Sequence, residues 1–315
     1  MSSHVPEKTS PHAAAPYLVI GGGLLAVSTA SLFIRYAQQE APSLVIAASR
    51  LAIATLILAP IAWKRSKSEI KALKGTQIRA LAISGLFLAL HFATWILSLE
   101  YTTVVQSVIL VSTTPLWVAL ISPAFLKERV TPIVIIGLLV ALAGSVMVGL
   151  SEVCQVGPSG VTCTPIGDFI KGRAFVGNML ALAGAWGAAG YVLIGRQARP
   201  NLSLLSYVFL VYGVAAACLL VGVAAAGYPL AGYSTRTYVW FVALALIPQI
   251  LGHSSFNWAL RYLPATFVSV SLLGEPIGTS ILAMIFLGES LSTLVLIGGV
   301  MIILGVYLVS RTQST

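Results

Sequence analysis

The strongest constraint in this sequence is a series of long apolar stretches separated by short polar segments. Each stretch has about 20 residues, and a helix of that length crosses the roughly 30 Å hydrocarbon core of a bilayer. The stretches are continuous rather than alternating, and they are about twice as long as the strands of a membrane barrel. Because a helix satisfies its backbone hydrogen bonds internally, the sequence predicts an all-α integral membrane protein.

Ten membrane-spanning helices are predicted from these stretches. Their ranges are 17–36, 43–63, 78–98, 104–126, 132–150, 175–195, 202–226, 238–260, 266–287 and 291–310. The composition agrees with this class, since only 9% of the residues are charged, whereas about 25% are charged in an ordinary soluble domain.

Basic residues predict the orientation, because cytoplasmic connections collect Lys and Arg. With a cytoplasmic N-terminus, 13 of the 18 basic residues lie in cytoplasmic segments and only 3 lie outside. Both termini are therefore predicted to be cytoplasmic, residues 1–16 forming a disordered tail, in a multi-pass protein of the plasma membrane. This topology and an anionic inner leaflet account for the net charge of +9, so no nucleic-acid partner is expected.

Two of the three cysteines, Cys154 and Cys163, share the loop 151–172, which the basic residues place outside the cytoplasm. An oxidising compartment permits a disulfide there, and the sequence leaves a bonded pair and two free thiols equally open. The cysteines fit no metal-site spacing, and no nucleotide-binding or metalloprotease motif occurs. We therefore expect no metal, no other cofactor and no enzymatic activity.

An internal repeat links the two halves of the chain at an offset of 161 positions. Residues 113–128 align with residues 274–289 without a gap, and the matched positions include Pro115 with Pro276, Phe125 with Phe286 and Glu128 with Glu289. The earlier helices of each half do not fit the same offset convincingly. The repeat is therefore established for the last two helices of each half and inferred for the others.

The helix count determines how the two copies are related. Five helices is an odd number, so the second copy enters the membrane from the opposite side. The sequence predicts two inverted five-helix repeats, 17–150 and 173–310, and secondary transporters commonly have this construction, with the substrate site near mid-membrane between the halves.

These features resemble the drug/metabolite transporter superfamily, and in particular its EamA-type members with two five-helix domains. The residues that carry the resemblance are Arg50 in Ser49-Arg50-Leu51-Ala52, the block from Pro115 to Glu128, and Glu275-Pro276 leading to Gly288-Glu289. The resemblance covers roughly residues 17–310. It implies a ten-helix fold that moves small metabolites, commonly by export of amino acids or related amphiphilic compounds.

Glu275 and Arg50 are charged residues inside predicted spans, and such residues are costly in lipid unless they are paired, hydrated or neutralised. Glu275 is a candidate for coupling or gating, and the alternative is that it organises the kink expected at Pro276. Pro115 predicts a kink at the equivalent place in the first half. Arg50 is a candidate for a structural or gating role, or for binding a substrate carboxylate.

Two helices carry polar side chains at one-turn spacing. Gln249, His253 and Asn257 are spaced by four residues, so they should share one helix face. His91 and Trp95 have the same spacing in the helix 78–98. Both sets are predicted to line a substrate cavity, and the alternative is interhelical hydrogen bonding. A histidine could also carry a proton, although a structural histidine is more common.

Three further residues are predicted to contact substrate, namely Gln106, Trp186 and Tyr191. Regularly spaced glycines, at 184, 187 and 190 and at 137 and 144, are predicted to let helices pack closely.

The sequence predicts a secondary transporter of a small polar or amphiphilic metabolite, with an amino-acid-like substrate, export as the direction, and a substrate gradient or protons as the energy source. The expected partners are that metabolite and the lipid bilayer, in a monomer or homodimer. Two alternatives remain from other classes: a passive channel or facilitator, and a membrane interaction protein that transports nothing.

Overall fold

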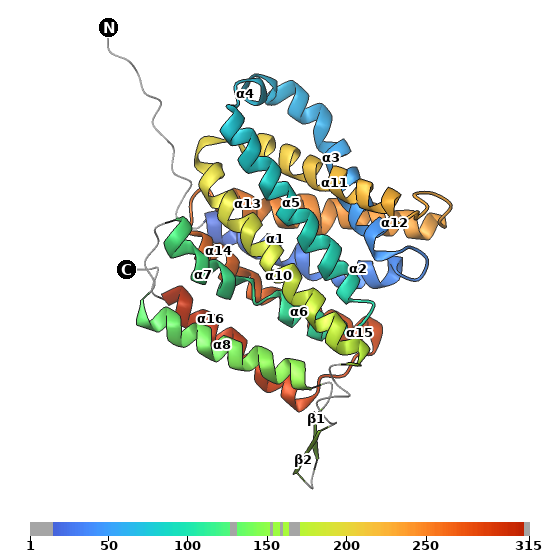
Figure 1. Cartoon of the computed structure of the whole chain (residues 1–315), viewed down its shortest axis with the longest axis vertical. Coiled ribbons are helices and arrows are strands. Elements are labelled where there is room, and N and C mark those ends of the chain that lie inside the picture. Colours follow the sequence, from blue (N-terminus) through green and yellow to red (C-terminus); the bar gives the residue numbers. More distant parts are fainter. Residues whose placement is uncertain (1–14, 127–130, 152–153, 158–159, 164–170, 312–315) are drawn as a thin grey trace.

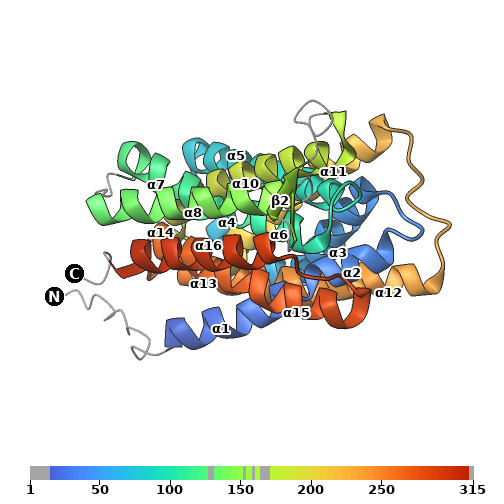
Figure 2. The ribbon, with the colours of Figure 1, turned by 90° about the horizontal axis from the view of Figure 1, so that it is seen from below.

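The computed structural model describes residues 15–126, 131–151, 154–157, 160–163 and 171–311, and these form an elongated bundle of helices (Figures 1 and 2). In the first half the elements are α1 (Ala15–Ser28), α2 (Ala30–Ala37), α3 (Ser43–Arg65), α4 (Lys67–Lys71), α5 (Gly75–Ser98), α6 (Val104–Val111), α7 (Thr114–Phe125) and α8 (Pro132–Leu150). A two-stranded hairpin, β1 (Cys154–Gly157) and β2 (Gly160–Cys163), follows.

The second half begins after the hairpin. Its elements are α10 (Arg173–Ala198), η1 (Arg199–Asn201), α11 (Leu204–Ala225), α12 (Thr235–Leu244), η2 (Ala245–His253), α13 (Ser254–Ala259), α14 (Ala265–Ser271), η3 (Leu272–Gly274), α15 (Glu275–Leu287) and α16 (Thr293–Arg311). Among the described residues, seven helical segments are long and apolar enough to cross a membrane, and three shorter apolar helices accompany them. The predicted class of helical membrane protein is confirmed.

The outer surface of the bundle is strongly apolar, as expected for side chains that face lipid. Large exposed apolar side chains occur on many helices, including Leu18, Leu25, Leu56, Leu86, Leu120, Leu139, Val221, Leu251, Ile285, Val300 and Tyr307. A soluble protein rarely exposes apolar patches of this extent. The same residues that would cause aggregation in water therefore suit a bilayer.

Several predicted helices are interrupted. The segment predicted at 17–36 divides into α1 and α2 at Thr29, and the segments around Pro115 and Pro276 each divide immediately before the proline. A proline cannot donate the backbone hydrogen bond that a continuous helix needs, but it fits the first turn of a new helix. The structure also adds a short helix, α4, that the sequence did not predict.

Several helices of the two halves start at matching positions. Helix α3 begins at Ser43 and α11 at Leu204, while α8 begins at Pro132 and α16 at Thr293. Each pair starts 161 residues apart, which is the offset of the sequence repeat, and the same offset separates the starts of α6 and α14. The matching start of α3 and α11 therefore extends the offset to a helix pair whose sequences do not show it convincingly.

Helices α8 and α16 pack against each other through reciprocal glycine contacts. A side chain at Gly144 would collide with the carbonyl oxygen of Gly298, and a side chain at Gly305 would collide with that of Gly137. Ascending numbers on one helix meet descending numbers on the other, so the helices are antiparallel. An exchange of the two repeats converts one contact into the other, which is the pattern of a two-fold relation.

The same correspondence appears in two further helix pairs. Helix α5 packs along α10, and α1 packs along η2 and α13. At the 161-residue offset, α5 corresponds to the run from α12 to α13, and α10 corresponds to the run from α1 to α2. One packing arrangement therefore occurs twice in the bundle.

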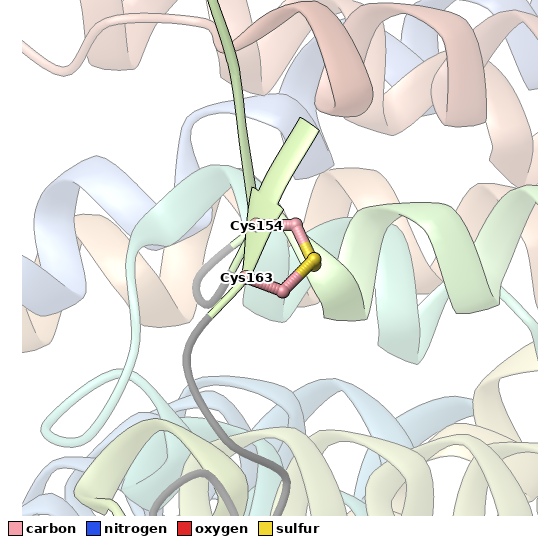
Figure 3. Close-up of a disulfide and its surroundings, with 2 residues drawn as sticks. All are labelled: Cys154 and Cys163. Atoms are coloured by element: carbon pink, nitrogen blue, oxygen red, sulfur yellow. A yellow bond between two sulfur atoms is a disulfide. The ribbon is translucent and has the colours of Figure 1, made fainter. Parts of the chain in front are cut away.

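The bundle has two distinguishable ends. We call the end with Ala15 and Arg311, near the labels N and C in Figure 2, the terminal end, and the opposite end the hairpin end. At the hairpin end β1 and β2 pair antiparallel, with Cys154 opposite Cys163, and a disulfide joins these residues (Figure 3). The predicted helical class holds, and this short strand pair is an addition to it that the sequence did not predict.

Candidate functional site

A cavity lies inside the bundle, between helices of both halves. Its volume is about 60 Å³, which is room for several water molecules. Apolar side chains form most of the wall, among them Val27, Val111, Val192, Phe256, Leu260, Val268 and Leu272. The polar side chains are few, as in most small-molecule sites, and comprise His91, Trp95, Ser112, Thr114, Tyr191, His253, Asn257, Ser269 and Glu275.

Two interrupted helices meet at this cavity. Thr114 begins α7 and Glu275 begins α15, and both residues line the wall. They occupy equivalent positions in the two repeats, and each is followed by a proline, Pro115 or Pro276. The N-terminus of a helix carries partial positive charge, so Glu275 lies where its carboxylate is stabilised by its own helix. Interrupted helices of this kind form the sites of many transporters.

The side chain of Arg50 is fully buried behind the cavity wall and does not line the cavity. Its Nε donates to Oε1 of Gln249 at 2.7 Å, and its guanidinium lies 4.2 Å from the ring centre of Phe92. Arg50 and Glu275 attract each other electrostatically, but within the described residues the pair forms no salt bridge. Arg50 and Glu275 are therefore not directly paired in this conformation.

The helix with Gln249, His253 and Asn257 departs from the prediction. Residues Ala245–His253 form a π-helix, η2, around Pro248. A π-helix has hydrogen bonds from i to i+5 and a wider turn than an α-helix, so a four-residue spacing no longer keeps side chains on one face. His253 and Asn257 line the cavity, whereas Gln249 is buried against Arg50.

His91 is held by a hydrogen bond and by ring packing. Its Nδ1 lies 2.9 Å from the carbonyl oxygen of Gly184, and because a carbonyl only accepts, Nδ1 carries a proton and donates this hydrogen bond. The ring stacks on Trp95 at 5.6 Å and lies 6.3 Å from the ring of His253. The cavity wall therefore contains a cluster of three aromatic rings, and two of them belong to histidines.

Two residues predicted to contact substrate lie away from the cavity. Trp186 is 53% exposed and packs edge to face on Trp117. It lies five residues before Tyr191, which does line the wall, and five residues of an α-helix rotate a side chain by about 140°. Trp186 therefore faces away from the cavity. Gln106 lies at the hairpin end, where it accepts from the hydroxyls of Thr102 and Thr103. Both predictions of cavity contact are corrected by these positions.

A set of carboxylates caps helices in a way that the sequence did not predict, and Glu289 is the clearest example. Its two oxygens accept from the backbone N–H groups of Val104 at 3.0 Å and Val105 at 3.2 Å, which are the first two residues of α6. Arg35 lies 4.0 Å from the same carboxylate and donates to the carbonyl of Thr102 at 3.0 Å. We call this contact the α6 cap.

Three other glutamates have the same kind of partner. Glu40 accepts from the Ser234 N–H at the start of α12, Glu69 from the Ser203 N–H at the start of α11, and Glu100 from the Ser43 N–H at the start of α3. The hydrogen bonds from Ser234 and Thr237 hold the pKa of Glu40 below its usual value. Burial raises the pKa of Glu69, but its hydrogen bonds with Ser203 and Ser206 outweigh burial and lower the pKa.

The local sequence offers little signal for these caps, since each carboxylate and its helix are remote in the chain. Only the start of each helix is visible, as a serine or threonine before an apolar run. No group of three His, Cys, Asp or Glu side chains suited to a metal ion occurs among the described residues.

A family model for the EamA-like transporter family matches this chain twice, over residues 15–150 and 175–311. The chain belongs to the EamA-like transporter family. It is thus a membrane transporter of the drug/metabolite transporter superfamily rather than an enzyme, and a multi-pass protein of the plasma membrane.

Individual relatives agree with this family. An uncharacterized transporter of Archaeoglobus fulgidus is 22% identical over 300 residues, covering 94% of this chain and 98% of the relative. An uncharacterized transporter of Clostridium kluyveri is 25% identical over 259 residues, covering 80% of this chain and 78% of the relative. A solved crystal structure matches with a TM-score of 0.66 at 17% identity, covering 96% of this transporter and 98% of that chain, which supports the fold.

Proposed function

We propose that this transporter is a secondary carrier that exports a small polar or amphiphilic metabolite, with an amino-acid-like compound as the substrate class. The observation that carries the proposal is the cavity, which draws its wall from both repeats and contains Glu275 at the start of an interrupted helix. Its mostly apolar wall suits an apolar body, and its few polar groups suit one polar end.

The proposed topology has ten spans in two inverted repeats, residues 17–150 and 173–310, with both termini in the cytoplasm. The matched helix boundaries and the reciprocal glycine contacts of α8 and α16 support an inverted pair. The terminal end contains the basic segment from Lys64 to Arg79, which favours the cytoplasm. The hairpin end contains the disulfide, which favours an oxidising compartment.

The proposed mechanism is alternating access of one central cavity. Every residue of α6 is buried, and α6 extends from the cavity wall at Val111 to the hairpin end, so it closes that side of the cavity. Glu289 belongs to the second repeat and holds the start of α6, which belongs to the first. Exposure of the cavity at the hairpin end therefore requires that the α6 cap breaks.

Glu275 is the proposed coupling residue. Its carboxylate reaches the cavity wall, whereas its electrostatic partner Arg50 remains buried behind that wall. A proton or a cationic group of the substrate can neutralise a carboxylate in this position, and neutralisation lowers the cost of moving it through the membrane interior. His91 and His253 are the other groups in the wall that could carry a proton.

The decisive experiment is flux in proteoliposomes that contain the purified full-length chain. A panel of amino acids, nucleosides, polyamines and organic cations is offered at two pH values, and counterflow is measured for each compound that moves. A carrier shows saturable flux that substrate on the far side accelerates, whereas a channel does not. The absence of flux for the entire panel would sink the proposal.

A further inference from the structure

A second hollow lies at the terminal end, on the outside of the bundle, where α3, α4 and α11 meet. Its volume is about 440 Å³, several times that of the central cavity. Seven residues line it: Ala59, Pro60, Trp63, Lys67, Ile70, Lys71 and Phe209. We call it the α3–α11 groove. No residue of the central cavity belongs to it, so it is a separate feature.

The floor of the groove is apolar. Ala59, Pro60 and Phe209 come from the parts of α3 and α11 that lie within the predicted spans, and Ile70 adds an apolar side chain from α4. Trp63 stands at one side and is 65% exposed. Tryptophan prefers the level where hydrocarbon meets headgroups, so the floor lies at the depth of acyl chains and the opposite rim at the depth of headgroups.

The rim of the groove is cationic. Lys67 and Lys71 are four residues apart on α4, and side chains with this spacing share one helix face. The ammonium of Lys67 lies 4.3 Å from the ring centre of Trp63, which keeps it over the groove. In the parts of the chain that the structure describes, neither lysine has a carboxylate within ion-pair distance.

The surrounding charge is unbalanced. Six basic residues occur between positions 64 and 79, namely Lys64, Arg65, Lys67, Lys71, Lys74 and Arg79, and Glu69 is the only acidic residue among them. Glu69 is engaged elsewhere, because its carboxylate accepts from the Ser203 N–H at 2.7 Å and from the hydroxyls of Ser203 and Ser206. The groove therefore offers positive charge without an internal counter-ion.

We propose that the α3–α11 groove binds one anionic phospholipid, with its phosphate between Lys67 and Lys71 and an acyl chain along Ala59, Pro60 and Phe209. Basic pockets between membrane helices attract such headgroups. A zwitterionic lipid would bring its own cation against the lysines, and a soluble anion would leave the apolar floor uncovered. Because α3 and α11 come from different repeats, the lipid lies across their junction.

This inference requires only that the chain spans a membrane, and it does not depend on the substrate or on the mechanism of transport. The test uses the full-length chain purified in a zwitterionic detergent. Phosphatidylglycerol is titrated in, and bound lipid is counted by native mass spectrometry while thermal unfolding is followed in parallel, because a ligand of the folded state raises its apparent stability.

Two double variants of equal charge separate the groove from the rest of the basic segment. Lys67→Gln with Lys71→Gln removes the rim, whereas Lys64→Gln with Lys74→Gln removes the same charge from exposed residues outside the groove. We expect the first pair to weaken phosphatidylglycerol binding roughly 30-fold, from the attraction of about two lysines to an anionic lipid. The second pair should retain binding within about threefold on the same reasoning, because its side chains do not line the groove.

A neutral variant tests the acyl-chain contact. Phe209→Ala should weaken the binding of long-chain phosphatidylglycerol and leave a short-chain form nearly unaffected. Unfolding of all variants without added lipid checks that they are folded. Equal loss in both double variants, equal binding of phosphatidylcholine, or displacement of the lipid by inorganic phosphate alone would each overturn the proposal.

Discussion

The carboxylates at the ends of the bundle and the carboxylate in its cavity are the same residue type in opposite situations. Glu40, Glu69, Glu100 and Glu289 each accept a backbone N–H at the start of another helix. Glu275 begins its own helix and faces the cavity, and within the described chain its carboxylate has no hydrogen-bond partner. The end carboxylates hold helices together, whereas the carboxylate of Glu275 lies in the cavity wall, which is why we propose it as the coupling residue.

The end carboxylates also differ among themselves. Glu100 caps a helix of its own repeat, whereas Glu289 caps a helix of the other repeat. If the two repeats move relative to each other, only a contact of the second kind must break. Glu100 is therefore the natural control for Glu289, since both are glutamates that accept backbone N–H groups at the hairpin end.

The largest effect is expected for Glu275→Gln. The variant cannot take up a proton or form an ionic contact, so we expect coupled flux to fall about tenfold or more, equivalent to the loss of one charge-assisted contact of roughly 1.5 kcal/mol. Flux is measured in proteoliposomes with and without a pH gradient. Glu100→Gln serves as the control and should keep its flux. Full coupled flux in Glu275→Gln would assign this residue to helix architecture.

The next largest effect is expected for Glu289→Gln, which weakens the α6 cap. A cap contributes about 1 kcal/mol, so the population that is open at the hairpin end should rise about fivefold. The readout is the labelling rate of Ser112→Cys, a cavity residue, by an impermeant thiol reagent added from outside. Cys218, the free cysteine among the described residues, is first replaced by alanine.

The same labelling in Glu100→Gln should stay at the parent rate, since that carboxylate caps a helix of its own repeat. Equal acceleration in both variants would indicate general loosening of the fold. No acceleration in Glu289→Gln would show that the α6 cap does not hold the hairpin end closed.

A smaller effect is expected for Glu69→Gln, which changes the cap of α11 at the terminal end. We expect a loss of about 0.5–1 kcal/mol in unfolding free energy, at the low end for a cap because this carboxylate is partly solvated. Its pKa is lower in the folded state, so its contribution is present above the unfolded value of about 4.3 and is lost as the pH falls through the folded value. Unfolding midpoints of parent and variant should therefore converge at acidic pH, and a constant difference would contradict this linkage.

The smallest effect is expected at the disulfide, which lies in the hairpin outside the helices. Cys154→Ser with Cys163→Ser should leave flux unchanged within about twofold, because the bridge closes a short local loop. Alkylation followed by mass measurement should add one group to the unreduced unfolded chain and three after reduction, since Cys218 is the third cysteine. Three groups without reduction would mean that the bridge does not form.

The helices and most of the polar residues of the cavity wall could be predicted because polar residues are rare inside apolar spans. His91, Trp95, Tyr191, His253, Asn257 and Glu275 were all found in this way, and all line the cavity. Trp186 was misplaced because the sequence indicates its depth in the membrane but not the direction in which its side chain projects from the helix. Gln249 was misplaced because a π-helix changes that rotation within one turn.

The capping carboxylates lay beyond prediction for a different reason. Glu289 and Val104 are 185 positions apart, and the sequence around neither residue predicts a contact with the other. Only the folded bundle brings an end of one repeat onto the start of a helix in the other. Which carboxylate caps which helix therefore depends on the tertiary structure and cannot be read from any single segment of the sequence.

The reciprocal glycine contacts of α8 and α16 have a mechanical consequence. The two glycines of each helix are seven residues apart, so the contacts are separated by about 10 Å along the axis. Two contacts at that spacing oppose sliding and tilting of α8 against α16, yet they leave rotation about the line that joins the contacts free. The α8–α16 contact can therefore serve as a rotation axis. Any relative movement of the two halves that keeps this contact intact is a rotation about it rather than a sliding of one helix along the other.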